Sequence, residues 1–325
     1  MTADTILVLT SPRDTTADLV VTALTERGAP VFRCDTAEFL DLLNVGAVLV
    51  DGGTNWSGRL RTPHRSVELE QIRCGYYRRP SAFAPDHSFD AATRDWISLQ
   101  ARLGFGGVLA AAVRWLNHPS RIGYAEYKPV QLTAAARAGL TVPPTLITND
   151  PATAERFARD VGELIYKPLS TQGTPGTAVY TNRISAAQLA DSAIGHTAHL
   201  FQQWVNKQYE VRLIVVDEQY LATAITAGSD AARVDWRTDY AALSYHIVST
   251  PMRVREGVAR LLRDLDLRFA AADFAVTKGG EWVFLDLNPN GQWAWIAKHT
   301  GLDIAGTIAD ALLATPTAAP ESPVS

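Results

Sequence analysis

The segment Leu285-Asp286-Leu287-Asn288-Pro289-Asn290-Gly291-Gln292-Trp293 places a carboxylate and a carboxamide two residues apart in an extended run. Alternate residues of a strand point to the same face, so Asp286 and Asn288 would present their oxygen atoms together. Upstream, Asp273 lies in a second apolar run, and Gly279-Gly280 between the two runs favours a hairpin. Three oxygen ligands on neighbouring strands suit Mg²⁺, which prefers carboxylates combined with substrate phosphates. The alternative interpretation is ordinary polar residues at strand ends beside a turn.

The size and composition of the chain limit its class. Its 325 residues predict two or three compact units, and its 47% hydrophobic content supports a full core. With a net charge of −4 the chain lacks the excess of positive charge that is typical of DNA- and RNA-binding proteins, so we expect no nucleic-acid partner. No stretch has the length and apolarity of a membrane span or a signal peptide, so we expect no membrane partner. Cys34 and Cys74 lie far apart without metal-ligand spacing, which favours a reducing, cytoplasmic location.

The order of apolar and polar runs predicts a mixed α/β protein. Apolar runs at 5–9, 31–34 and 45–51 predict strands of an N-terminal parallel sheet. We expect one long helix over 90–114, weakened or kinked at its glycines, Gly104, Gly106 and Gly107. The predicted units are an N-terminal domain (1–116), a central domain (117–199), a strand-rich C-terminal domain (200–315) and a disordered Ala/Pro/Ser-rich tail (316–325).

A lysine ends the apolar run 164–167 and leads into a loop of small residues that contains Gly173 and Gly176. Glycines let backbone N–H groups approach phosphate oxygens, and Lys167 supplies a point charge, so this segment can close over a polyphosphate. It is not a Walker A sequence, because the lysine precedes the glycines. A strand that ends in a surface loop is an equally good interpretation. Lys128 on its own indicates an ordinary solvated lysine at the start of a helix.

A nucleotide could also be held by the connector between the central and C-terminal units. Gln203 and the backbone groups of Trp204 and Val205 could read the hydrogen-bonding edge of adenine, and Glu210 could accept from ribose hydroxyls. Arg212 shares a strand face with Glu210 and suits a phosphate or a substrate carboxylate. Glu-x-Arg on a strand is otherwise a common cross-strand surface pair.

In their order along the chain, these features resemble the ATP-grasp superfamily over nearly the whole length. Within it, the chain resembles the peptide maturases that make graspetides, the microviridin-type synthetases. The more specific similarities are Tyr76-Tyr77-Arg78-Arg79-Pro80, the run 139–149 after Lys128, Asp235-Trp236-Arg237, and the run 287–293. One departure is Asp286, where many relatives carry glutamate, which shortens the side chain but keeps its charge.

The resemblance implies an ATP-grasp fold with a Rossmann-like N-terminal pre-ATP-grasp domain, a central α/β domain and a C-terminal antiparallel lobe. It implies an ATP- and Mg²⁺-dependent macrocyclase of a precursor peptide that has a leader and a core. Asp or Glu side chains of the peptide would be phosphorylated and joined to Ser/Thr hydroxyls as esters or to Lys amines as amides. The resemblance also implies a role for each candidate residue. The phosphates of ATP would be bound by Lys128, Lys167, Gly173 and Gly176, and adenosine by Gln203, Trp204, Val205 and Glu210. The metals would be bound by Asp273, Asp286 and Asn288, and the transferred phosphate by Arg212 and Arg237.

Two other functions stay open. One is a RimK-like ligase that adds an amino acid to a protein or a small acid, against which the run 288–293 argues. The other is a non-catalytic nucleotide- or peptide-binding module, although both lysines and all three metal ligands are present. The aromatic group Trp236, Tyr240, Tyr245 and His246 is a candidate peptide contact, yet such density more often indicates core. The resemblance makes a homodimer possible, but no sequence motif indicates one.

Overall fold

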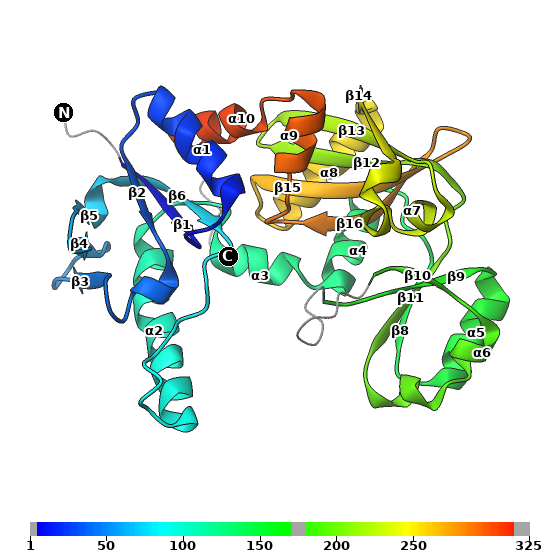
Figure 1. The fold of residues 1–325 in the computed structure, drawn as a ribbon, viewed down its shortest axis with the longest axis horizontal. Coiled ribbons are helices and arrows are strands. Elements are labelled where there is room, and N and C mark those ends of the chain that lie inside the picture. Colours follow the sequence, from blue (N-terminus) through cyan, green and yellow to red (C-terminus); the bar gives the residue numbers. More distant parts are fainter. Residues whose placement is uncertain (1–4, 171–179, 315–325) are drawn as a thin grey trace.

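The computed structural model describes residues 5–170 and 180–314, whose helices and strands form three groups along the chain (Figure 1). The N-terminal group contains β1 (Thr5–Thr10), α1 (Thr15–Glu26), β2 (Val31–Cys34), β3 (Asn44–Val48), β4 (Ser57–Arg61), β5 (Ser66–Glu68), β6 (Ile72–Arg78), α2 (Ala91–Ala112) and β7 (Trp115–Leu116). Two helices, α3 (Pro119–Ala125) and α4 (Lys128–Arg137), lead to the central group. That group contains β8 (Thr145–Thr148), α5 (Pro151–Val161), β9 (Leu164–Lys167), β10 (Asn182–Ile184), α6 (Ala186–Leu189) and β11 (His199–Gln203).

The C-terminal group consists of a large antiparallel sheet and the helices around it. Its elements are β12 (Lys207–Val216), β13 (Gln219–Ala227), α7 (Asp230–Val234), β14 (Leu243–Val248), α8 (Met252–Asp264), β15 (Phe269–Thr277), β16 (Trp282–Asn288), α9 (Ala294–Thr300) and α10 (Ile304–Leu313). The sheet order is β14-β13-β12-β15-β16. The expected hairpin at Gly279-Gly280 joins β15 to β16, and Gly280 has the positive φ of 79° that such a turn requires.

The N-terminal group contains a parallel sheet in the order β2-β1-β6-β7. Strand β1 is buried on both faces, because Ile6 and Val8 pack with α1 while Leu7 and Leu9 pack with α2. The predicted third parallel strand, 45–51, is wrong: β3 pairs with β4 in a separate antiparallel sheet, β3-β4-β5. The residues of β3 alternate between exposed and half-buried, whereas a central parallel strand needs both faces covered, and β6 meets that need.

Helix α2 runs without interruption over its 22 residues, so its glycines do not break it. Asp90 caps its N-terminus and accepts a hydrogen bond from the backbone N–H of Thr93 at 2.9 Å. The buried residues of this helix are Ala101, Phe105 and Leu109, which lie on one face against the N-terminal sheet.

The central group is a small sheet, β10-β9-β11-β8, with α5 and α6 packed on one side (Figure 1). The predicted boundary between residues 199 and 200 falls inside β11, which pairs with β8 and β9. A boundary that follows the sheets lies after Gln203. We propose the same three units, with the boundary between the central and C-terminal units placed after Gln203.

The two faces of the C-terminal sheet carry different kinds of side chains. One face packs Val211, Leu213 and Phe274 against α4 and α8. The opposite face is divided along the strands, because Ile214 and Ala271 lie under α1, α9 and α10, whereas the positions nearer the central group carry charged side chains. Within the described ranges, no helix is long and apolar enough to cross a membrane.

Candidate active site

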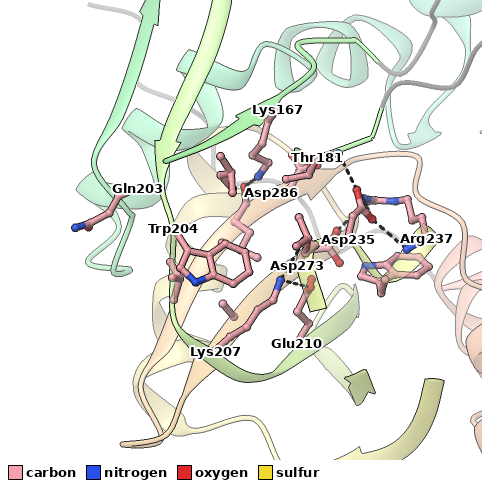
Figure 2. A pocket seen from close by; sticks show the side chains of 16 residues that line it. Lys167, Thr181, Gln203, Trp204, Lys207, Glu210, Asp235, Arg237, Asp273 and Asp286 are labelled. Carbon is pink, nitrogen blue, oxygen red and sulfur yellow. Dashed lines mark hydrogen bonds and ion pairs between the residues drawn. The ribbon is translucent and has the colours of Figure 1, made fainter. Parts of the chain in front are cut away.

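A cavity open to solvent lies where the central and C-terminal groups meet (Figure 2). Strand β9 and the connector after β11 form one side of it, and the charged half of the C-terminal sheet forms the other. Its lining residues are Ile165, Lys167, Thr181, Gln203, Trp204, Val205, Lys207, Glu210, Val234, Asp235, Trp236, Arg237, Asp273, Ala275, Leu285 and Asp286. Most of the residues that the sequence assigned to ATP and metal are therefore close together.

The strand register aligns an arginine and two carboxylates in one row. Arg212 of β12 is paired with Asp273 of β15, which is paired in turn with Asp286 of β16. Residues opposite each other point to the same face, so all three side chains lie on the cavity side of the sheet. The guanidinium of Arg212 donates to Oδ2 of Asp273 at 3.0 Å, and both side chains are buried.

The two carboxylates have different electrostatic surroundings. Burial raises the pKa of Asp273, against the attraction of Arg212 and Arg237. Burial would also raise the pKa of Asp286, but the attraction of Lys128 and Lys167 outweighs it and lowers this pKa below its ordinary value. Lys128 forms an ion pair with Oδ1 of Asp286 and is therefore not the solvated lysine that its local sequence suggests.

Lys167 is a half-buried cation that forms no ion pair within the described residues. Its ammonium donates to the carbonyl of Leu285 at 2.8 Å and lies 3.5 Å from Oε1 of Gln202. Burial lowers the pKa of Lys167 to about 8, with Asp286 opposing the shift and Lys128 adding to it. An anion bound beside the ammonium would raise the pKa of this lysine toward its ordinary value.

In the connector, the side chain of Gln203 does not point where the sequence predicted. The side chain of Gln203 points away from the cavity and donates to the carbonyl of Val161 at 2.8 Å (Figure 2). Gln202 is buried and lies on the side of the β9–β11 pair that carries Lys167, whose ammonium is 3.5 Å from its Oε1. Strand alternation could have found this residue. Trp204 and Val205 do line the cavity.

Glu210 is buried and paired with a residue that the sequence analysis did not select. The ammonium of Lys207 lies 2.6 Å from Oε1 of Glu210 and 5.0 Å from the centre of the Trp204 ring. A register shift between Lys207 and Tyr209 brings this lysine to the cavity side of the strand. Sequence alternation cannot anticipate such a bulge.

Arg237 lies at the opposite end of the cavity from the connector. It donates to both oxygens of Asp235 and lies 3.8 Å from Oδ2 of Asp273. Asp235 also accepts from the backbone N–H of Thr181 at 3.0 Å, which ties the central group to this segment. The Asp235-Trp236-Arg237 segment is thus both a structural turn and part of the cavity wall.

Two of the more specific sequence motifs, 76–80 and 287–293, meet in space. Arg78, at the end of β6, donates to the backbone carbonyl of Asn290 at 2.9 Å and to its side chain at 3.0 Å. Thr16 of α1 donates to Oε1 of Gln292 at 2.9 Å. The N-terminal group therefore holds the loop that directly follows Asn288.

The two glycines that were predicted to contact phosphate, Gly173 and Gly176, lie outside the described residues.

Comparison with known proteins places this geometry in a family. Residues 125–312, which contain the described cavity residues, match the RimK-like ATP-grasp domain. The chain belongs to this ATP-grasp family. A comparison with curated protein sequences finds no match.

Solved ATP-grasp structures resemble the chain from end to end. A RiPP-associated ATP-grasp ligase from Chryseobacterium gregarium, in complex with ADP and a leader and core peptide, is 25% identical with a TM-score of 0.86, covering 95% of this chain and 96% of that one. The macrocyclase MdnC from Microcystis aeruginosa, bound with the precursor peptide MdnA, is 26% identical with a TM-score of 0.83, covering 95% and 99%. The macrocyclase MdnB from the same organism is 28% identical with a TM-score of 0.80 and the same coverage.

The donor atoms of this ATP-grasp site fit a nucleotide with Mg²⁺. Asp273, Asp286 and Asn288 offer two carboxylates and a carboxamide on adjacent strands, and hard divalent cations prefer such oxygens. Among the described residues, no three His, Cys, Asp or Glu side chains are grouped so that they could hold a metal by themselves. Among residues 5–170 and 180–314, Nε of buried Arg212 has no hydrogen-bond partner and Lys167 has no carboxylate partner, so both groups can bind phosphate oxygens.

Proposed function

We propose that the chain is an ATP-dependent ligase that closes rings in a ribosomally made precursor peptide. It would join side-chain carboxylates of Asp or Glu to Ser/Thr hydroxyls as esters or to Lys amines as amides. The observation that carries this proposal is the end-to-end match, because two peptide-bound ligases align with 95% of the chain, well beyond residues 125–312. Their peptides are the reason for preferring a peptide substrate over a small acid.

The chemistry needs positioning and charge neutralisation more than an enzyme nucleophile. A carboxylate oxygen of the peptide attacks the γ-phosphorus of ATP, ADP leaves, and an acyl phosphate forms on the peptide. A hydroxyl or amine of the same peptide then attacks the acyl carbon, phosphate leaves, and the proton of the nucleophile is released. Each ring therefore removes one water from the peptide.

The buried charges of the cavity suit these two steps. Mg²⁺ held by Asp273, Asp286 and Asn288 would neutralise charge on the transferred phosphoryl group. Lys128 and Lys167 would hold the phosphates of ATP, while Glu210 and the connector would hold adenosine. Arg212 and Arg237 flank Asp273 and would bind the transferred phosphate and the acyl phosphate.

We also propose a cytoplasmic location. Cys34 and Cys74 are both buried and unpaired, which agrees with a reducing compartment.

Mass spectrometry of the candidate precursor peptide tests the proposal. The substrate to test is a short peptide with repeated Thr and Glu or Asp residues, to be sought among the genes that neighbour the one for this chain. After incubation with enzyme, ATP and Mg²⁺, we expect the peptide to lose one water per ring. A mass gain equal to an amino acid would instead support RimK-like addition, and an unchanged mass would contradict both ligase functions.

A variant of the proposed metal set tests the assignment of the site. Asn288→Ala should abolish turnover while peptide binding persists, because it removes an oxygen donor without unpairing a buried charge. Asp273→Ala should have the same effect on turnover, although it leaves Arg212 without its carboxylate partner. The matched control is Asn182→Ala at an exposed position of β10 outside the cavity. Full activity in Asn288→Ala would remove this residue from the metal set.

A further inference from the structure

The two carboxylates of the proposed metal set are already bound by other side chains of the chain. Asp286 uses Oδ1 for its ion pair with Lys128, and its Oδ2 accepts from Nδ2 of Asn288 at 3.5 Å. Asp273 uses Oδ2 for the hydrogen bond from Arg212 at 3.0 Å. A metal ion that binds these oxygens must therefore compete with the groups that hold them.

The charge of the cavity also opposes a cation that arrives alone. Each of the four carboxylates that line the cavity lies at ion-pair distance from a lysine or an arginine, and none of these carboxylate side chains is more than 12% exposed. Lys167 adds a further positive charge beside them. A polyphosphate brings several negative charges and reverses this balance, so the electrostatics favour a divalent cation together with its nucleotide.

We propose that Lys128 couples the binding of the metal to the binding of the nucleotide. In this arrangement Lys128 holds Asp286 until a phosphate of the nucleotide draws its ammonium away, and only then are the carboxylate oxygens free for Mg²⁺. The lysine exchanges one anionic partner for another, so its charge stays paired throughout. The inference rests on the nucleotide and metal roles proposed above, and it adds that tight metal binding requires the nucleotide.

The start of α4 is fixed, so the exchange needs only the lysine side chain to move. Lys128 is the first residue of α4, and Gln131, one turn later, is buried. Its Nε2 donates to the carbonyls of Ala125 and Leu287 at 2.6 and 2.7 Å, and its Oε1 accepts from the N–H of Leu287 at 3.1 Å. These bonds tie α4 to β16 directly beside Asp286. The flexible stem of a lysine can then change partner while its backbone stays in place.

Mn²⁺ binding, followed by electron paramagnetic resonance, tests the coupling without any turnover, because Mn²⁺ accepts the same oxygen ligands as Mg²⁺. The signal of the Mn²⁺–ADP complex is measured without protein and subtracted. For the wild type, we expect saturating ADP to lower the dissociation constant for Mn²⁺ roughly 100-fold, near the upper end of common coupling strengths. Equal Mn²⁺ binding with and without ADP would overturn the proposal.

Substitutions of Lys128 test whether this lysine carries the coupling. Lys128→Met should tighten the binding of Mn²⁺ alone about tenfold or more, because an adjacent cation changes the affinity of a carboxylate for a proton by a similar factor. A lysine that only contacts phosphate would leave this value unchanged, and that result would contradict the proposal. Lys128→Arg keeps the charge and should bind Mn²⁺ alone as weakly as the wild type. Melting curves confirm that the variants fold, and Lys128→Gln replaces Lys128→Met if the latter does not.

The matched control is Lys207→Met, which removes the same charge from the same cavity but frees Glu210 instead of Asp286. It should leave the binding of Mn²⁺ alone near the wild-type value. Equal tightening in Lys207→Met and Lys128→Met would assign the effect to the net charge of the cavity and overturn the specific role of Lys128. A wild type that binds no Mn²⁺ even with ADP would contradict the metal set itself. None of these measurements needs the peptide, so failure of the coupling and failure of ring closure are separate results.

Discussion

The charged residues of the site differ in the direction in which their surroundings shift the pKa. Asp286 keeps its charge because two lysines surround it, whereas burial raises the pKa of Asp273 despite two arginines. Lys167 is half-buried and has no carboxylate at ion-pair distance among the described residues, so its protonation depends most directly on what binds beside it.

Nucleotide affinity should depend on pH through Lys167. With a pKa of about 8, this lysine is mostly charged at pH 7 and mostly neutral at pH 9, and only the charged form attracts phosphate. The dissociation constant for ATP should therefore rise roughly tenfold between pH 7 and pH 9. Calorimetric titration with ATP and Mg²⁺ measures this change, and Lys167→Arg should flatten it because arginine stays charged. Equal slopes in both proteins would contradict the assignment.

The same shift predicts a stability effect with the opposite sign from that of a salt bridge. The unfolded chain keeps the proton of Lys167 up to about its model value of 10.5, while the folded chain releases it near 8. The unfolded state thus binds more protons between these values, so Lys167 makes stability rise with pH across this window. Below it the buried charge is unfavourable, and Lys167→Met should raise the melting temperature at pH 7 while it weakens ATP binding. A lowered melting temperature would show that the bonds of Lys167 to Gln202 and Leu285 outweigh the burial of its charge.

At the scale of elements, the strands β12, β15 and β16 and the loop after β16 act as one unit. Register places Arg212, Asp273 and Asp286 in a row. The loop that follows Asn288 packs back onto β15, where Gly291 lies against Ala271. Gly291 makes this return possible, because a Cβ there would overlap the Cβ of Ala271. The spacing of the proposed metal ligands thus depends on Gly291, which is not itself a proposed metal ligand.

Gly291→Ala should therefore impair catalysis more than folding. The added methyl group would push the loop away from β15 and displace Asn288, and a displacement of about 1 Å can reduce turnover 10- to 100-fold. Turnover of the precursor peptide and the melting temperature should be measured together. The matched control is Gly279→Ala at the other end of β16, where a Cβ meets only Oγ1 of Thr277 at 3.7 Å. Unchanged turnover in Gly291→Ala would mean that the loop adjusts without moving the ligands.

Across the whole molecule, one buried asparagine connects the N-terminal group to the open end of the β15–β16 hairpin, where β15 begins and β16 ends. Asn117 donates to the carbonyls of Phe269 and Pro289 at 2.7 and 2.8 Å. It accepts from the N–H groups of Arg268 and Phe269 at 2.8 and 2.9 Å. These contacts reach the start of β15 and the loop after β16, so the N-terminal group and the catalytic sheet are stabilised together.

Asn117→Ala should lower the free energy of unfolding by roughly 2–4 kcal/mol, because it leaves four backbone groups without their partner in a buried place. Urea denaturation followed by circular dichroism measures this loss. Asn182→Ala, which removes a single local hydrogen bond to Tyr180 at an exposed site, should change stability by less than about 1 kcal/mol. A similar, small change in both variants would show that water replaces the bonds of Asn117.

The sequence by itself determined which residues carry the chemistry and which local elements hold them. Strand and helix patterns are local, so β9, β15 and α4 could be predicted, and the carboxylate and lysine positions followed from them. Tertiary structure alone decided the partner of each charge: Lys128 pairs with Asp286, Lys207 turns toward Glu210, and the third strand of the parallel sheet comes from β6. These choices depend on strand register, bulges and contacts between residues more than a hundred positions apart. Local periodicity carries no information about such contacts, because many pairings satisfy the same pattern and only close packing selects one.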